Sequence, residues 1–246
     1  MDHKVVGTID QAVNVGATTV TSAPSQEFAM PATSNIWSDA PEVVRLFPSF
    51  VWKSALRSEV HESLNKLILG RLDAMRRGLP PLQRGKAWQS SHCLHTLNEF
   101  SALVSCIDAA AQRVLEFLRI DSNALCITGC WANIYAPGSS HRMHTHPNNY
   151  FSGVYYVQVQ EGANSIAFHD PRPETAVIRP PVTELTAYNT DQVLVTVENG
   201  TLLVFPAWLP HTVDENRSEC ARISVSFNLM FTSFAETMAK PLWGET

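Results

Sequence analysis

The hydrophobic pattern changes its period near residue 124, and this change limits the fold more than any other feature of the sequence. Before it, apolar residues recur every three or four positions, as they do on helices that are apolar on one side. After it, apolar and polar residues alternate. Strands that follow the helices as a group argue against a parallel sheet of strand–helix–strand units. We therefore expect a mainly β protein with N-terminal helices, whose strands form a sandwich or a closed barrel.

Two long helices are predicted in the first half of the chain, over residues 58–77 and 97–118. Ser58 is expected to cap the first helix, and Gly78 followed by two prolines ends it. Thr96 and Glu99 have the spacing of a capping box at the start of the second. Each helix carries one apolar stripe, so both are expected to cover a sheet.

Seven strands are predicted after the change of period, because short alternating runs are separated there by turn residues. Their ranges are 125–135, 152–160, 164–168, 175–179, 192–197, 201–205 and 222–231. A further strand over residues 46–52 contains Pro48, which predicts an edge position. Residues 1–43 show no clear period and are interpreted as an arm. Residues 44–246 are interpreted as one domain, with a helical cover over 54–121 and a β core over 122–235.

Composition excludes several classes of function. The net charge of −5 over 246 residues argues against a surface that binds nucleic acid. An apolar run of about 18 residues is missing, so no membrane-spanning helix is expected. The first residues lack the basic start and apolar block of a signal peptide. The five scattered cysteines are interpreted as reduced thiols in the core of a cytoplasmic protein. The sequence leaves the oligomeric state open, with a homodimer as the candidate.

Histidines concentrate in the β half and point to a metal site. His144 and His146 are two residues apart, so on an extended segment their side chains share one face. A third ligand has to come from elsewhere, and His211 is well placed in a turn bounded by prolines. Each of these histidines taken alone could be structural. His169 and Asp170 are adjacent and therefore face opposite sides, which disfavours joint metal binding.

The last predicted strand places Arg222, Ser224 and Ser226 on one face and apolar residues on the other. An arginine that points into a barrel needs an anion, and its planar guanidinium matches a carboxylate. The alternative is a surface arginine paired with Glu219 or Asp214. The neighbouring histidines favour the inward orientation, and with it a ligand that carries a carboxylate.

With these motifs the chain resembles the iron(II)- and 2-oxoglutarate-dependent oxygenases, in particular their bacterial and phage group. The resemblance covers about residues 44–231. The stretches that carry it are 46–48, 88–90, 131–135, 144–148, 152–157, 168–172, 200–206, His211 and 222–228.

The resemblance implies a double-stranded β-helix (a jelly roll, or cupin-like fold) covered by the two long helices. It implies that His144, His146 and His211 hold Fe(II). Arg222 and Ser224 would bind the distal carboxylate of 2-oxoglutarate, and Asn133 or Tyr135 would reach its other end.

One of the implied metal ligands departs from the usual pattern, in which two histidines and one carboxylate bind the iron. Here His146 stands at the position of the carboxylate. The centre could therefore have three histidines, or Asp170 could supply the carboxylate, or one of the histidines is not a ligand.

The implied function is a non-haem dioxygenase that hydroxylates a C–H bond of a small metabolite or natural-product intermediate, with succinate and CO2 as co-products. Its partners would be the substrate, 2-oxoglutarate and O2. Two alternatives stay open: a three-histidine cupin-type dioxygenase that does not use 2-oxoglutarate, and a non-catalytic metal-binding β-sandwich. Loops 79–95 and 180–191 are expected to shape the pocket. Four aromatic residues are candidate pocket walls, and at least two of them are expected to pack in the core instead: Trp131, Tyr155, Tyr156 and Trp208.

Overall fold

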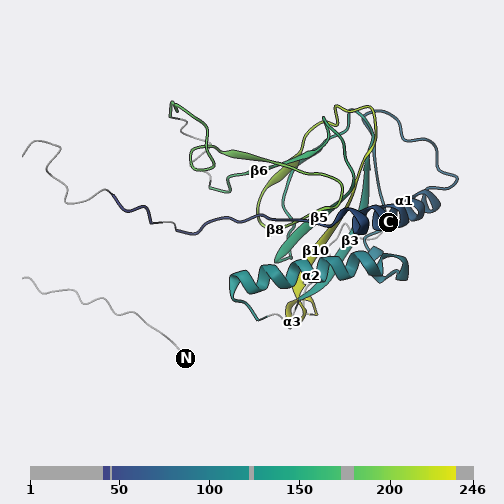
Figure 1. Cartoon of the computed structure of the whole chain (residues 1–246), viewed down its shortest axis with the longest axis horizontal. Coiled ribbons are helices and arrows are strands. Elements are labelled where there is room, and N and C mark those ends of the chain that lie inside the picture. The colour runs from purple at the N-terminus through teal and green to yellow at the C-terminus, as the bar shows by residue number, and fades with distance from the viewer. Residues whose placement is uncertain (1–40, 45, 122–124, 173–179, 237–246) are drawn as a thin grey trace, which may run out of the picture. The chain divides into compact units, whose positions relative to one another are not determined.

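The structure is a computed structural model, which describes residues 41–44, 46–121, 125–172 and 180–236. The chain divides into two units, Met1–Leu46 and Phe47–Thr246. The second unit contains all of the helices and strands described below (Figure 1).

The described residues of this unit form ten strands and three α-helices, with two short 3₁₀ turns before the second helix. In chain order the elements are β1 (Trp52–Ala55), α1 (Ser58–Met75), β2 (Ala87–Gln89), η2 (Leu94–Thr96), η3 (Asn98–Phe100), α2 (Ser101–Leu118), β3 (Leu125–Tyr135), β4 (His141–His144), β5 (Phe151–Gln158), β6 (Ser165–His169), β7 (Gln192–Thr196), β8 (Thr201–Pro206), β9 (His211–Val213), β10 (Arg222–Phe231) and α3 (Thr232–Ala235).

The strands form two antiparallel sheets. The larger sheet has the order β1-β8-β5-β10-β3-β2, and the smaller has the order β4-β9-β6-β7. Strands that are neighbours in a sheet are mostly far apart in sequence, as the crossing connections of a double-stranded β-helix require. The predicted mainly β fold with N-terminal helices is confirmed.

Residues alternate between two cores across the larger sheet. On β10, Ile223, Val225 and Phe227 belong to the core that also contains the helices. On β5, Tyr155 joins that core, whereas Tyr156 belongs to a second core that contains residues of both sheets. The period of two in the sequence therefore separates a helix-facing side from a side that faces the smaller sheet.

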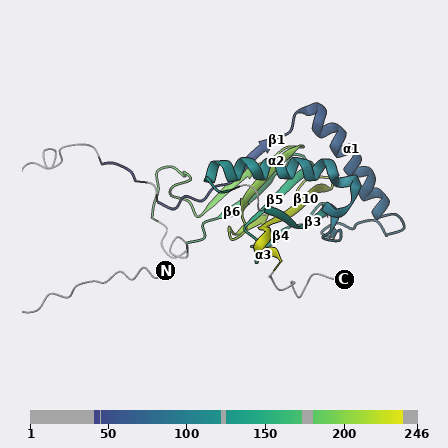
Figure 2. The same ribbon diagram turned by 90° about the horizontal axis from the view of Figure 1, so that it is seen from below.

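The two long helices cover the first of these sides, and Figures 1 and 2 show α2 lying across the strands. The buried apolar residues of the helices in this core are Leu64, Ile68, Leu72, Leu103, Ile107, Ala111, Val114 and Leu115. They follow the spacing of three and four that predicted the helices. Val60 and Leu67, which the same pattern included, are 38% and 60% exposed, so the buried stripe of α1 is narrower than predicted.

The predicted caps of both helices are wrong. The residue before the first turn of α1 is Arg57, which makes no capping bond through its side chain. The hydroxyl of Thr96 donates to the carbonyl of Cys93, and Glu99 forms an ion pair with Arg71 of α1. Since η3 occupies the predicted first turn of the second helix, α2 begins only at Ser101.

Several strand boundaries also differ from prediction. The edge strand β1 begins at Trp52, later than the predicted 46–52, and it pairs with β8. Strands β2, β4 and β9 were not predicted, because each has only three or four residues. The predicted strand 175–179 lies outside the described residues.

Two further expectations concern the cysteines and the membrane. All five cysteines are free, but Cys93 and Cys220 are exposed, so the assignment of every cysteine to the core is wrong. Among the described residues, no helix is both long and apolar enough to cross a membrane.

Candidate active site

A cavity of about 560 Å³ is lined by residues of both sheets. The smaller sheet and its connections contribute a group of histidines. The larger sheet contributes a row of polar residues from β10 and the facing residues of β3. These are the two patterns that the sequence singled out, and the fold brings them to one space.

Three histidines converge in this cavity. The ring nitrogens that His144, His146 and His211 offer to a metal all lie within 4.8 Å of one another. The pairing of β4 with β9 places His144 directly opposite His211. His146 follows β4, and its backbone N–H donates to the carbonyl of Ala207 at 2.8 Å, which fixes the chain beside the start of β9.

Backbone carbonyls orient two of the three rings. Nδ1 of His144 lies 2.8 Å from the carbonyl oxygen of Arg142, and Nδ1 of His211 lies 2.9 Å from that of Leu209. A carbonyl can only accept, so each Nδ1 carries the proton, and each Nε2 of a neutral ring keeps its lone pair. Nε2 of His146 is 3.3 Å from Nε2 of His211. A metal ion is the partner that would satisfy both lone pairs.

The three rings are neutral at physiological pH. Burial lowers the pKa of His146 to about 3, and the neighbouring imidazoles lower it as well. Burial also lowers the pKa of His211 to about 4, and it lowers the pKa of His144. The neutral imidazole is the form that binds metals, so the donor set fits a divalent ion such as Fe(II).

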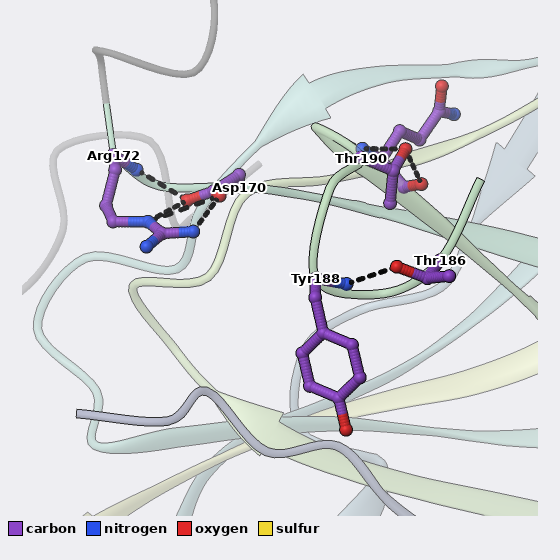
Figure 3. Close-up of polar contacts among 6 residues, drawn as sticks. Asp170, Arg172, Thr186, Tyr188 and Thr190 are labelled. Atoms are coloured by element: carbon purple, nitrogen blue, oxygen red, sulfur yellow. Dashed lines mark hydrogen bonds and ion pairs between the residues drawn. The ribbon is translucent and has the colours of Figure 1, made fainter. Parts of the chain in front are cut away.

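Asp170 does not join this group. Its carboxylate accepts hydrogen bonds from the guanidinium of Arg172, at 2.9 Å from Nε and 2.5 Å from Nη2 (Figure 3). The hydrogen bond to Arg172 holds the pKa of Asp170 below its usual range. Among the described residues, the three histidines form the one cluster that could hold a metal, and no aspartate or glutamate lines the cavity.

Arg222 is buried in the same cavity without a counter-ion. Only 3% of it is exposed. Nη1 donates to the carbonyl of Ser165 at 3.0 Å, and the guanidinium lies 5.2 Å from the ring centre of Tyr156. Nε has no partner, and no carboxylate among the described residues forms an ion pair with Arg222. The predicted inward orientation is therefore correct, and pairing with Glu219 or Asp214 is not observed.

A buried guanidinium with an unpartnered N–H costs free energy of folding unless a bound anion accepts its hydrogen bond and balances its charge. The cavity therefore fits a ligand with a carboxylate at the Arg222 end and metal-binding atoms at the histidines, which is the chemistry of 2-oxoglutarate.

The other predicted cofactor residues also line the cavity. Ser224 is buried and lies opposite Asn133 in the β10–β3 register. The amide of Asn133 donates to the hydroxyl of Ser226 at 3.0 Å and accepts from Gln89 at 2.9 Å. Tyr135 shares a hydrogen bond of 2.9 Å between its hydroxyl and Nδ1 of His141.

Two of the four predicted aromatic walls are correct. Trp131 and Tyr156 line the cavity. Tyr155 points to the helix side, where its hydroxyl donates to Asn65 at 2.7 Å, and Trp208 is 54% exposed. Loop 79–95 contributes as expected, whereas no described residue of loop 180–191 lines the cavity.

Among the cavity residues that the sequence did not single out are His141, Gln89 and His92. The ring of His141 stacks on that of His144, with centres 4.1 Å apart. Gln89 and His92 come from the predicted loop, but nothing in their own pattern marked them. The pairing of β2 with β3 brings Gln89 to the cavity, and the backbone bond from Cys130 of β3 to the carbonyl of His92 holds His92 there.

Comparison with known proteins finds a similar family and similar folds. A family model described as "Putative 2OG-Fe(II) oxygenase" matches residues 129–228. This range contains the three histidines and Arg222. No curated protein sequence matches the chain.

Solved structures share the fold at low sequence identity. The α-ketoglutarate-dependent carbocyclase SnoK from nogalamycin biosynthesis has a TM-score of 0.53 and 11% identity, over 74% of this chain and 79% of that one. HygX from Streptomyces hygroscopicus, solved with nickel and 2-oxoglutarate, has a TM-score of 0.51 and 15% identity, over 74% and 82%. A prolyl hydroxylase from Trichoplax adhaerens, solved with a peptide, has a TM-score of 0.52 and 12% identity, over 77% and 87%. The family model covers the part of the chain that contains the three histidines and Arg222, and the solved structures show that the chain shares the fold of these enzymes.

Proposed function

We propose that His144, His146 and His211 hold Fe(II), and that Arg222 and Ser224 bind the distal carboxylate of 2-oxoglutarate. The observation that carries this proposal is a buried arginine without a counter-ion in the same cavity as three converging neutral imidazoles. The reaction is the hydroxylation of a C–H bond in a small molecule. When bound, iron and 2-oxoglutarate supply the oxidation, which consumes O2 and 2-oxoglutarate and releases succinate and CO2.

The residues of this chain position the reactants. The guanidinium of Arg222, held by Ser165 and stacked against Tyr156, fixes one end of 2-oxoglutarate and leaves its keto acid end toward the histidines. The carbonyls of Arg142 and Leu209 keep Nε2 of His144 and His211 directed at the metal. His141 packs on His144 and is anchored by Tyr135, so it limits rotation of that ring.

The apolar walls keep bulk water away from the reacting atoms. Phe205 packs edge-on against His211, with ring centres 4.8 Å apart, and Trp131 lies 6.0 Å from His146. We further propose a cytoplasmic location, which the five free cysteines support.

The test is turnover without added substrate. The protein is incubated with Fe(II), O2 and 2-oxoglutarate, and succinate is measured by mass spectrometry. We expect slow succinate formation that is lost in His211→Ala and in Arg222→Ala. A visible charge-transfer band should also develop when Fe(II) and 2-oxoglutarate are added without oxygen. Tight zinc binding with neither succinate nor the band would favour a metal-binding β-sandwich.

A further inference from the structure

We propose that the wall of the cavity formed by Gln89, His92, Trp131 and Asn133 binds the substrate, and that it recognises a carboxylate on that substrate. We call these four residues the amide wall. The inference rests on the proposed function, because it concerns the part of the cavity outside the residues proposed for the metal and 2-oxoglutarate. It assigns Asn133 to the substrate in place of the expected contact with 2-oxoglutarate.

The cavity extends well beyond the part assigned to 2-oxoglutarate. The residues of β10 that line it run from Arg222 to Asn228, and this stretch of strand spans about 20 Å at the usual rise per residue. 2-Oxoglutarate would lie between Arg222 and the histidines. His146 is next to Trp131, which pairs with Ser226 in the β10–β3 register. Asn133 lies opposite Ser224 and Gln89 lies opposite Asn133, so the amide wall lies beside β10, over β3 and β2. The space over these two strands is therefore the place for a substrate close to the metal.

A chain of hydrogen bonds crosses the amide wall. Nε2 of His92 is 3.2 Å from Oε1 of Gln89. The Gln89 amide donates to Asn133, and the Asn133 amide donates to Ser226. Each primary amide has two N–H groups and uses one of them in this chain. One N–H of Gln89 and one of Asn133 are left to donate, so the wall is suited to a ligand group that accepts hydrogen bonds.

Aromatic stacking holds the wall in place. The imidazole of His92 lies on the indole of Trp131, with ring centres 4.5 Å apart and planes inclined by 19°. Burial lowers the pKa of His92. The backbone N–H of Cys130 donates to the carbonyl of His92 at 2.8 Å, which ties this loop to β3. The donors are therefore pre-oriented, and a ligand that they bind loses less affinity to the ordering of side chains.

The charge of the cavity favours an anion. Arg222 is the one charged side chain among the described residues that line it, and no acidic residue is present. With three neutral imidazoles as ligands, Fe(II) brings two positive charges and Arg222 a third. Bound 2-oxoglutarate neutralises two of them. The one positive charge that remains attracts a carboxylate and repels an ammonium group in a site of low dielectric.

The experiment measures binding, without turnover. The protein is loaded with Ni²⁺, saturated with 2-oxoglutarate, and titrated with benzoate, benzamide and benzylamine, which differ only in the group on the ring. Binding is followed by NMR. We expect benzoate to bind at least about tenfold more tightly than benzylamine. Gln89→Ala and His92→Ala should each weaken benzoate about threefold to tenfold, the effect of one lost hydrogen bond.

Gln192→Ala is the matched control, because Gln192 is an exposed glutamine on β7 outside the cavity. It should leave benzoate binding unchanged. The affinity for 2-oxoglutarate, measured separately, should stay within about twofold in Gln89→Ala and His92→Ala, so a failure of the proposed cosubstrate site is seen on its own. If the proposed 2-oxoglutarate site fails, benzoate binding that is weakened by Gln89→Ala and His92→Ala still supports the amide wall. Three results would overturn the proposal of the amide wall: benzoate displaces 2-oxoglutarate, benzoate binds no more tightly than benzylamine, or neither Gln89→Ala nor His92→Ala weakens benzoate binding.

Discussion

His144 and His211 are fixed by bonds to carbonyl groups only two residues before them, at Arg142 and Leu209. Short-range bonds of this kind orient a ring without help from distant parts of the chain. His146 lacks such a bond, and its ring instead meets His211 across the cavity. The three positions should therefore respond differently to substitution.

His211→Ala should abolish retention of iron without unfolding the protein. His211 is the histidine of the cluster that lies farthest along the chain, and its apolar neighbours Phe205 and Leu209 stay in the second core, between the two sheets. The measurement is metal content after gel filtration, with circular dichroism as the control for folding. One iron bound with unchanged affinity would contradict the assignment of the metal site.

His146→Asp should keep the iron, because two histidines and a carboxylate are the common ligand set for this metal. If His146 is a ligand, the number of nitrogen atoms bound to the metal falls by one, and spectroscopy that counts them measures the change. An unchanged nitrogen count would mean that His146 does not bind the metal.

Arg222→Ala should weaken 2-oxoglutarate far more than iron. Leaving a buried carboxylate without its partner costs about 3–5 kcal/mol. At about 1.4 kcal/mol per factor of ten, this corresponds to a loss of affinity on the order of a hundredfold or more. Arg222→Lys should keep only part of the affinity for 2-oxoglutarate, since an ammonium group cannot form the two parallel hydrogen bonds that a planar guanidinium makes with a carboxylate. The check is anaerobic titration with 2-oxoglutarate. A change of only a few-fold would favour the dioxygenase that does not use this cosubstrate.

At the scale of the elements, the larger sheet depends on close contact between β5 and its two neighbours. Gly153 of β5 lies opposite Phe227 of β10 and Val204 of β8. A Cβ at Gly153 would be 2.5 Å from the carbonyl oxygen of Leu203 and closer still to the ring of Phe227. The ring fills the space that a side chain would need.

Gly153→Ala should therefore destabilise the protein by about 1–3 kcal/mol, the usual cost of overpacking. Gly70→Ala is the matched control, because a Cβ at that position in α1 meets nothing within 4 Å. It should stabilise the protein by about 0.5–1 kcal/mol through helix propensity. Urea unfolding measures both. Equal effects of the two substitutions would show that the contact with Phe227 carries no strain.

At the scale of the whole molecule, the buried histidines link folding to pH. The folded-state pKa values of His141, His146 and His211 are about 4, 3 and 4, against an ordinary value of 6.5, mainly because of burial. Below pH 6.5 the unfolded chain thus binds more protons than the folded one. The stability that these groups contribute is present above pH 6.5 and is lost as the pH falls toward 4.

The metal-free protein should therefore be less stable at pH 5.5 than at pH 7.5, by roughly 1 kcal/mol for each of the three histidines. Urea unfolding at the two pH values measures this difference. His211→Asn, which cannot titrate, should reduce it by about one third. A stability that is equal at both values would mean that these rings are as accessible to protons in the folded state as in the unfolded chain.

The sequence by itself determined the class of fold and the main features of the site. Its change of period separated helices from strands, and alternation along 222–231 placed Arg222 inside and Val225 against the helices. Both patterns are local consequences of which side of an element is buried. The histidine spacing was readable for the same reason.

Tertiary structure decided what depends on residues that are distant in the chain. Glu99 does not close the predicted capping box, because it pairs with Arg71 of another helix. Strands β2, β4 and β9 exist through their partners, since a run of three or four residues carries too little pattern to be recognised. Contacts with β3 bring Gln89 and His92 to the cavity. Asp170, the carboxylate that the sequence offered as an alternative metal ligand, forms an ion pair with Arg172 instead. Local patterns determine on which face of an element a side chain lies. The residues that it contacts from distant parts of the chain are determined by tertiary packing.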